Sequence, residues 1–340
     1  MEAVVVDAGS KLLKIGFASP DQDPALLTWV IMPTKMKRVL EDGDGGGDVS
    51  MVEEVTANPV VRGFIRDWDA MEDLLQHVLY IDLGWEVGDE GQILSAEPLF
   101  TPKAFMPLNK WLLSLHAVGH ISGCTVDIGH WKIDIAPVCE GVVQHIASKR
   151  FQIGGIDLTN LLAQKLKKSN PLVKVDISEV EKLIEQYTLC FSTSFIYGIV
   201  EQLVRSISSV SSENLRQLLE NTMLCGGTTS MTARSSFPPA CLINLPDTLG
   251  FEERFQKEAN LCSSSIRPSL IKPPEYMPEN LSKNSAWMGG VILAKVVFPQ
   301  NQHVTRGDYD ETGPTIIHKK MLLGLVELTL GERHCCCIIS

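Results

Sequence analysis

Two short stretches of the chain place an aspartate and a glycine at a turn between apolar residues. They read VVVDAGSKLLKIGFA from Val4 to Ala18 and CTVDIGHWKIDIAPV from Cys124 to Val138. Alternating apolar residues around a short glycine-containing break predict a strand, a tight turn and a second strand. An aspartate entering such a turn can face a metal-bound phosphate, and the glycine lets backbone N–H groups come close to it. Both stretches therefore suggest phosphate-binding hairpins.

The second hairpin carries bulky side chains where a phosphate needs room. Gly129 is followed by His130 and Trp131. Tryptophan adopts positive φ only at a cost, and its indole would compete with a phosphate for space. Two interpretations stay open. The hairpin is either a phosphate site that does not support catalytic turnover, or a buried hairpin whose open end is filled by the tryptophan side chain.

The repetition of the hairpin predicts a duplicated architecture. Both stretches read Val-Asp-x-Gly, two turn residues and then apolar alternation, and they lie roughly a hundred residues apart. Such a repeat suggests two lobes that each offer a loop to a shared cleft. A chain of 340 residues is too long for one small core and suits two lobes.

The composition is that of an ordinary soluble protein with an acidic balance. Hydrophobic residues make up 44% and charged residues 21% of the chain, and the mean hydropathy is +0.08. The formal net charge is −11 and the pI is about 5.2. These values argue against direct nucleic-acid binding, which needs a basic face to displace counterions.

The cysteines and the apolar segments indicate a cytosolic or nuclear protein. Nine cysteines occur without paired CxxC spacing, and Met1–Pro24 does not read as a secretory leader. Reduced thiols are therefore expected. No stretch of about 18 or more apolar residues exists, so a membrane span is not expected.

Other segments predict the elements that position the hairpins. Ile65–Tyr80 and Ile199–Glu220 have the period of amphipathic helices. Leu224–Thr232 (LCGGTTSMT) reads as a strand end and a turn rich in small hydroxyl residues, and Ala286–Phe298 (AWMGGVILAKVVF) as a Gly-Gly turn entering an apolar helix. The expected core positions of the first helix are Trp68, Met71, Leu74, Leu75 and Val78.

An acidic, glycine-rich stretch, EDGDGGGD, runs from Glu41 to Asp48. Its Asp-x-Asp pattern hints at calcium, but no glutamate stands at the closing position of a calcium loop and no helices flank the stretch closely. A flexible surface loop is the better interpretation.

Seven segments resemble, in order, the landmark segments of the actin family. They cover most of the chain: VVDAGSKLLKIGFA, RGFIRDWDAMEDLL, LSLHAVGHISGCTVDIGH, LCGGTTSM, RFQKEANL, AWMGGVILAKV and DYDETGPTIIHKK. The resemblance implies an α/β fold of the duplicated actin/Hsp70/hexokinase type (ribonuclease H-like), with two lobes around a nucleotide cleft and truncated segments. Divergence at phosphate-contacting positions makes the chain look like a nuclear actin-related protein instead of a conventional actin.

The resemblance implies a site for ATP or ADP with Mg²⁺ between the hairpins. It places Asp7 and Asp127 beside the metal. The matching nucleotide-binding positions are Asp7, Gly9, Ser10, Leu12 and Lys14 in the first loop, Asp127 and Gly129 in the second, and Glu185, Gly226, Gly227, Thr228 and Thr229 on the adenosine side.

Several positions depart from the family's pattern, and we therefore expect no efficient ATPase and assign no catalytic residue. Lys110 takes the place of the glutamine that orients the attacking water, and Asp134 that of a nearby histidine. Hydrolysis needs a positioned nucleophile, and an ammonium cannot accept a proton from water unless its pKa falls far. The other departures are Lys11 for a glycine, His130 for the second aspartate, Trp131 for the second glycine and Ile184 for the lysine that flanks the adenine.

Whole segments also depart from the family. A helix and a strand are missing between Ala104 and Lys110, a hairpin-rich part of the small lobe is missing after Tyr187, and residues 233–250 are inserted. Removing a core strand exposes apolar faces and unpaired backbone groups. We expect these departures to come from the gene model or from splicing; an isoform that does not fold stably is a further possibility.

Residues 321–340 continue past the usual end of the family. The last four, from Cys337 to Ser340, fit a C-a-a-X prenylation signal, with Cys337 as the lipidation site. No polybasic run precedes them, so read-through of non-coding sequence is favoured and membrane attachment is not expected.

The resemblance also sets the predicted domain bounds. The first lobe covers 1–117, with a small subdomain at 33–61, and residues 285–320 return to it. The second lobe covers 118–284, with a shortened small subdomain at 154–204.

The leading functional hypothesis is a non-catalytic structural subunit of a nuclear chromatin-remodelling complex. The implied partners are a long helix of the remodeller's motor subunit and other actin-like subunits, and the implied location is the nucleus and also the cytoplasm. The alternative is a nucleotide-binding, filament-forming cytoskeletal protein with slow or no ATP hydrolysis, which the persistence of Asp7, Lys14 and Asp127 favours.

Overall fold

The computed structural model describes the chain as two compact units. It covers residues 3–18, 29–40, 53–88, 91–97, 108–169, 171, 174–187, 193–229, 250–262, 267–275, 277–278, 281–297, 304–313 and 316. One unit comprises Met1–Leu108 and Ala294–Ser340, and the other comprises Asn109–Leu293. The acidic loop at 41–48, the inserted residues up to 249 and the tail at 321–340, with Cys337, lie outside the described residues.

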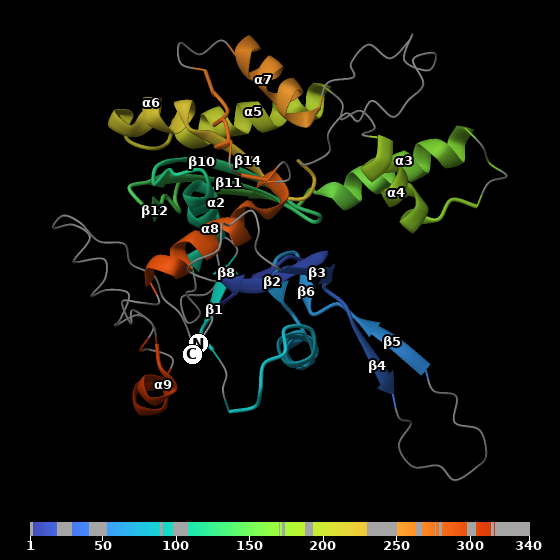
Figure 1. The fold of residues 1–340 in the computed structure, drawn as a ribbon. Helices are drawn as coiled ribbons and strands as arrows, with labels where there is room; N and C mark the ends of the chain where they lie inside the picture. The colour runs from blue at the N-terminus through green and yellow to red at the C-terminus, as the bar shows by residue number, and fades with distance from the viewer. Residues whose placement is uncertain are drawn as a thin grey trace. The chain divides into compact units, whose positions relative to one another are not determined.

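The first unit is built on a mixed sheet (Figure 1). Its centre is the predicted antiparallel hairpin of β1 (Ala3–Ala8) and β2 (Leu12–Ala18). β3 (Trp29–Pro33) pairs with β2 in antiparallel fashion, and β8 (Ile93–Glu97) pairs with β1 in parallel. The strand order is therefore β3-β2-β1-β8, and β9 (Leu108–Asn109) follows β8 at the boundary between the units.

A helix packs on this sheet where the sequence predicts one, but it begins later and changes form. α1 (Trp68–Gln76) continues into a π-helix, η2 (His77–Asp82). The prediction of a core position at Trp68 is wrong: its side chain is 55% exposed in the first turn of α1. The core against the hairpin comprises Val4, Val6, Leu13, Ile15, Leu74, Val78 and Leu79.

Smaller elements accompany this sheet within the first unit. β4 (Met36–Leu40) pairs with β5 (Glu53–Ala57), and β6 (Val60–Val61) pairs with β7 (Phe64–Ile65). Near the C-terminal end of the described chain lies α9 (Arg306–Thr312).

The second unit contains the second predicted hairpin, β10 (Gly123–Ile128) and β11 (Ile133–Cys139). β14 (Thr222–Cys225) joins β10 in parallel, and β12 (Val142–Val143) and β13 (Lys149–Phe151) both pair with β11. The order β12-β11-β10-β14 thus repeats the plan of the first sheet.

The two hairpins share one register. Asp7 faces Lys14 across the first hairpin, and Asp127 faces Asp134 across the second. Adding 120 to both members of any pair in the first hairpin gives a pair in the second. The parallel strands β8 and β14 pair with corresponding positions of β1 and β10, since Val4 faces Ile93 and Cys124 faces Thr222. A slip of one residue would turn every side chain to the other face, so the shared register supports the predicted duplication.

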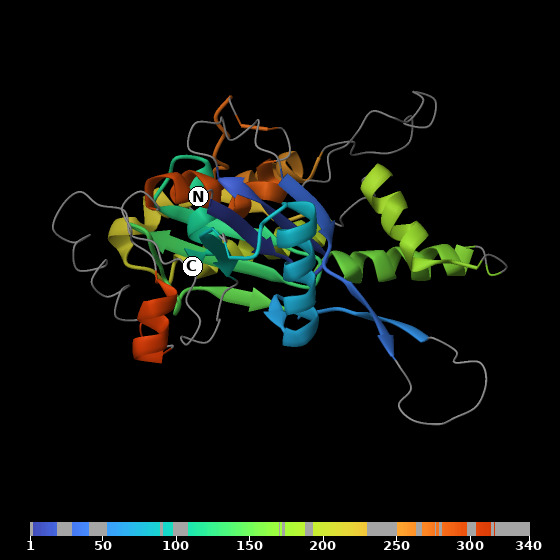
Figure 2. The same cartoon turned by 60° about the horizontal axis from the view of Figure 1, so that its bottom comes forward.

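Helices cover both faces of the second sheet. Figure 1 shows α5, α6 and α7 on one face and α2 on the other, and Figure 2 shows the same layers from a second direction. α3 and α4 pack against each other around Ala163, Val180 and Ile184. The bounds are α2 (Lys110–Ala117), α3 (Gly155–Ser169), α4 (Ile177–Tyr187), α5 (Thr193–Ile207), α6 (Ser212–Glu220), α7 (Phe251–Leu261) and α8 (Leu281–Val297).

Helix α2 lies in the second unit, whereas the predicted domain bounds place it in the first lobe. Trp111, Leu113 and Leu115 of α2 are fully buried, and the helix contacts β10, β11, β12 and β14. Burial of this apolar face against the second sheet decides the assignment. None of the described helices is long and apolar enough to cross a bilayer.

The expected helix over Ile199–Glu220 is two helices, α5 and α6. Ser208 and Ser209 stand at the break, where their hydroxyls donate to the carbonyl oxygens of Val204 and Ser206 at 2.7 and 2.6 Å. Serine side chains that bond to nearby carbonyls compete with helix continuation, and this explains the interruption.

The Gly-Gly turn expected within Ala286–Phe298 is wrong, because α8 runs through it. A Cβ atom on Gly289 would overlap the carbonyl oxygen of Leu113 in α2. Nearby, the buried Ser285 hydroxyl donates to Ser114 Oγ at 3.0 Å. Gly289 is therefore required for the close approach of two helix backbones, and this contact overrides the low helix propensity of glycine.

Gly289→Ala tests this packing. Steric overlap with the backbone of α2 should lower the free energy of unfolding by about 1–3 kcal/mol despite the better helix propensity of alanine. Gly198→Ala in α5 is the matched control, because a Cβ there meets nothing within 4 Å and should stabilise the chain by roughly 0.5–1 kcal/mol. Urea unfolding of both variants gives the comparison, and equal midpoints would contradict the close approach.

Candidate functional site

The first hairpin holds a buried ion pair at its turn. Lys14 Nζ donates to Asp7 Oδ2 at 2.7 Å, and both residues are less than a tenth exposed. They face each other across β1 and β2, so the hairpin register sets the pair. A buried carboxylate needs such a counter-charge.

The turn that follows Asp7 is braced by hydrogen bonds. Gly9 N donates to Leu12 O at 3.0 Å, and Thr34 Oγ1 donates to Gly9 O at 2.6 Å. Ser10 Oγ accepts from Gly63 N at 2.8 Å. A Cβ on Gly9 would lie 2.8 Å from the carbonyl oxygen of Leu12, so the turn requires glycine for close approach.

The second hairpin forms the same turn. Gly129 N donates to Lys132 O at 2.9 Å, which repeats the bond of the first turn. Neither His130 nor Trp131 is among the described residues with positive φ, so the bulky pair fits the turn without left-handed strain. The two rings meet edge to face with centroids 5.4 Å apart, and His130 Nε2 lies 3.9 Å from Glu181 Oε1 of α4.

Two further segments of the second unit converge on this turn. At the start of α3, Gly155 N donates to Gly129 O at 3.0 Å and Ile156 N donates to His130 O at 2.9 Å. After β14, Thr228 Oγ1 also donates to Gly129 O at 3.1 Å. The structure therefore brings Gly129 and Thr228 together, as well as Gly155 and Ile156, which sequence reasoning missed; their signal was the Gly-Gly pair before an amphipathic helix.

Asp127 lies at the centre of this group. Its side chain is 5% exposed, and its Oδ2 atom lies 3.2 Å from Lys110 Nζ. Its Oδ1 atom is buried and has no hydrogen-bond partner among the described residues. Gly226, with φ +99°, passes so close that a Cβ there would overlap Oδ1. Lys110 and Asp127 are thus in contact, which sequence reasoning did not foresee.

Asp134 belongs to a buried ionic triad. Arg150 donates to it through Nε at 2.6 Å and Nη2 at 3.0 Å, and Lys132 Nζ lies 2.8 Å from Oδ2. Asp134 has no exposed surface. Burial lowers the pKa of the Lys132 ammonium, although the neighbouring Asp134 carboxylate opposes that shift. The position where the family has a histidine is therefore locked in a charge cluster.

The structure gives fewer contacts for the predicted residues on the adenosine side. Thr229 Oγ1 donates to Gly226 O at 2.7 Å and stabilises the turn after β14, whereas Gly227 is exposed at that turn. Glu185 falls within α4, but its side chain lies outside the described part of the chain. Burial raises the pKa of the Cys225 thiol beside Asp127, which keeps this cysteine protonated.

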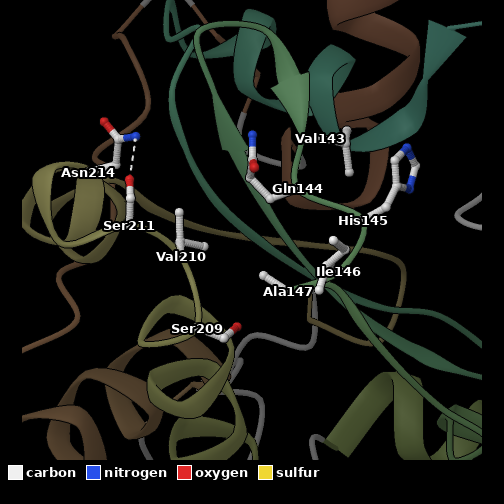
Figure 3. Close-up of a pocket in the computed structure, with 9 residues that line it drawn as sticks. All are labelled: Val143, Gln144, His145, Ile146, Ala147, Ser209, Val210, Ser211 and Asn214. Atoms are coloured by element: carbon white, nitrogen blue, oxygen red, sulfur yellow. Dashed lines mark hydrogen bonds between the residues drawn. The ribbon is translucent and has the colours of Figure 1, made fainter.

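A pocket of about 420 Å³ opens elsewhere on the second unit (Figure 3). Its lining is apolar or uncharged apart from His145, and it includes none of the predicted nucleotide residues. Ile146 at its rim is fully exposed. Because no lysine or arginine lines it, this pocket does not suit a polyphosphate.

Removing the Asp134 carboxylate tests the triad. Asp134→Asn leaves Lys132 and Arg150 buried without their anion and should lower the free energy of unfolding by about 3–5 kcal/mol. Glu201→Gln is the control, because it breaks an exposed ion pair: the Glu201 side chain is 41% exposed and that of its partner Arg205 is 61% exposed. Loss of this pair should lower the free energy of unfolding by only about 0–1 kcal/mol. Urea unfolding measures both, and similar losses for both variants would rule out a structural role for the triad.

A family model described as Actin matches residues 1–105, 97–189 and 175–322. Neighbouring pieces overlap at 97–105 and 175–189, close to the two places where family segments are expected to be missing, and residues 323–340 lie beyond the match. The match confirms the expected actin/Hsp70/hexokinase-type two-lobed ATPase fold, in keeping with the duplicated hairpins.

The chain is similar to several curated proteins over nearly all of its length. It is 56% identical to Actin-related protein 7 of Oryza sativa subsp. indica over 381 aligned positions, which cover 94% of this chain and 99% of the relative. It is 53% identical to Actin-related protein 7 of Arabidopsis thaliana over 382 positions, with the same coverage. Human Actin-like protein 7B is 25% identical over 94% of this chain and 88% of its own length.

The alignment with the rice protein is longer than the 340 residues of this chain, so the relative carries residues that this chain lacks. Matched by the family model over most of its length, and more than half identical to these plant proteins, the chain belongs to the actin family as an actin-related protein.

Proposed function

We propose that the protein is a non-catalytic structural subunit of a nuclear chromatin-remodelling complex. The observation that carries the proposal is the contact of Lys110 with the buried Asp127 at 3.2 Å. An ammonium held by a carboxylate cannot act as a base toward water, and Asp134 is likewise held by two cations. A site locked in this way supports a scaffold rather than a turnover enzyme.

Nucleotide binding without efficient hydrolysis belongs to this proposal. The braced turn at Gly9, the pair of Asp7 with Lys14, and the turn at Gly129 support a site for ATP or ADP. Mg²⁺ with the nucleotide stays a prediction from the resemblance, with Asp7 and Asp127 as its expected neighbours. A nucleotide held in this way would stabilise the fold by mass action.

The proposed partners are a helix of the remodeller's motor subunit and other actin-like subunits. The net charge of −11 suits basic protein surfaces better than DNA, and we propose no direct nucleic-acid contact and no membrane attachment. The proposed location is the nucleus, with a cytoplasmic fraction. The identity of more than half to plant Actin-related protein 7 supports a role shared with those proteins.

The second candidate is a nucleotide-binding cytoskeletal protein with slow or no hydrolysis. It is favoured by the buried pair of Asp7 and Lys14, which keeps the first loop in the form expected for phosphate contact. Against it stands the loss of small-lobe residues after Tyr187, because the resemblance implies that these segments make filament contacts.

Purified protein is expected to release ADP or ATP on denaturation, in about one-to-one ratio with the chain, and to show no measurable ATP turnover. Chromatography of the supernatant after acid precipitation gives the ratio, and a phosphate-release assay gives the turnover. Lys14→Gln is the comparison variant, because it removes the ammonium of the first hairpin that can donate to a phosphate oxygen, and it should lower the ratio of nucleotide to chain. Steady ATP hydrolysis by the unaltered chain would favour the second candidate.

Tagged protein expressed in plant cells is expected to recover a remodeller motor subunit and actin-like subunits from nuclear extract. A matched pull-down with conventional actin controls for contacts that any member of the family makes. Recovery of filament-associated proteins alone, with no motor subunit, would contradict the chromatin role and support the cytoskeletal one.

A further inference from the structure

The carboxylate of Asp127 is closed to a divalent cation in this structure. Mg²⁺ needs a carboxylate oxygen at about 2.0–2.1 Å in an open octahedral shell. Oδ2 of Asp127 already faces the Lys110 ammonium at 3.2 Å, so a divalent cation at this oxygen would meet a like charge at close range. Oδ1 is buried and has no hydrogen-bond partner among the described residues. The residues present therefore do not fit a metal ion at Asp127, although they fit a positive charge.

Lys110 stands at a position that a lysine ordinarily avoids. It is the first residue of α2, and the preceding Asn109 makes no side-chain cap. The N-terminal end of a helix carries partial positive charge, so a cation there is unfavourable unless an anion compensates it. Asp127 is that anion, and the pairing explains why a lysine is tolerated at the start of this helix.

The pair is also placed to meet an anion from solvent. The Lys110 side chain is 19% exposed, whereas Asp127 is 5% exposed, so the ammonium lies on the solvent side of the carboxylate. An ammonium carries three N–H donors and can hold a carboxylate and a phosphate oxygen together. The nearby triad of Lys132, Asp134 and Arg150 adds one net positive charge to the same unit.

From this arrangement, we propose that Lys110 is a built-in cation that replaces the divalent metal at Asp127. The second unit then presents its hairpin to the phosphates of a metal-free nucleoside di- or triphosphate. Nucleotide binding at the second hairpin consequently needs no divalent cation at Asp127, where the resemblance implies Mg²⁺. This inference rests on the proposed nucleotide binding, and it names Lys110 as the residue that decides the metal requirement.

The first test uses nucleotide-free full-length protein and Mg²⁺ alone. The unaltered chain should melt at the same temperature in EDTA and in millimolar Mg²⁺, because its carboxylate is already neutralised. Lys110→Gln leaves Asp127 without its cation, and Mg²⁺ should then raise its melting temperature by about 1 °C, since one carboxylate without a phosphate binds Mg²⁺ weakly. Lys165→Gln, on the exposed surface of α3, removes the same charge away from Asp127 and should behave like the parent.

The second test measures the affinity for ATP and ADP with and without Mg²⁺ by fluorescent-nucleotide titration. Affinity should change less than about threefold for the unaltered chain and for Lys110→Arg, which keeps the charge. Lys110→Gln should lose about tenfold or more in EDTA, equivalent to about 1.4 kcal/mol, and recover in Mg²⁺. Equal metal dependence of the parent and Lys110→Gln would overturn the inference.

The two tests separate failure of this inference from failure of nucleotide binding. If no variant binds nucleotide, the binding proposal fails, while the melting curves still report whether Mg²⁺ and Lys110 compete for Asp127. The double variant Lys110→Gln, Asp127→Asn removes both charges, so it should fold, and Mg²⁺ should not change its melting temperature. A double variant that melts as low as Lys110→Gln alone would overturn the pairing.

Discussion

The structure depends on neutralising carboxylates that lie buried at the ends of hairpin strands. Asp7, Asp127 and Asp134 are each less than a twentieth exposed, and a buried carboxylate without a counter-charge would favour unfolding. Each has a cation from its own unit: Lys14 for Asp7, Lys110 for Asp127, and a lysine with an arginine for Asp134. Each unit therefore holds its hairpin charges in balance by itself.

This balance links the fold to the proposed role. In a turnover site, charged groups must be available to a nucleophile or a metal ion, and their cost is met when the ligand binds. Here the side chains themselves supply the compensation, so the turns at Gly9 and Gly129 keep their shape without chemistry. A protein that serves as a partner surface gains from this arrangement, because its shape does not depend on the stage of a reaction cycle.

Much of the fold could be predicted from the chain. The twin Val-Asp-x-Gly stretches predicted the two hairpins, and both hairpins have the same register in the structure. Local pattern was less reliable where tertiary contacts compete with it. The Gly-Gly pair at Gly289 predicted a turn, but Gly289 lies inside α8, where the backbone of α2 leaves no room for a Cβ. Trp68 stands at a helical position expected to face the core, yet its side chain is exposed.

Sequence alone determined the family, the duplicated hairpins and the residue types at the two turns, since these follow from the order of motifs and from strand period. Only the tertiary structure decided which charges meet. Lys110 lies 17 positions before Asp127 on a different element, and the two come together because the apolar face of α2 packs on β10. Contacts of this kind depend on packing direction and side-chain reach, which no local pattern encodes.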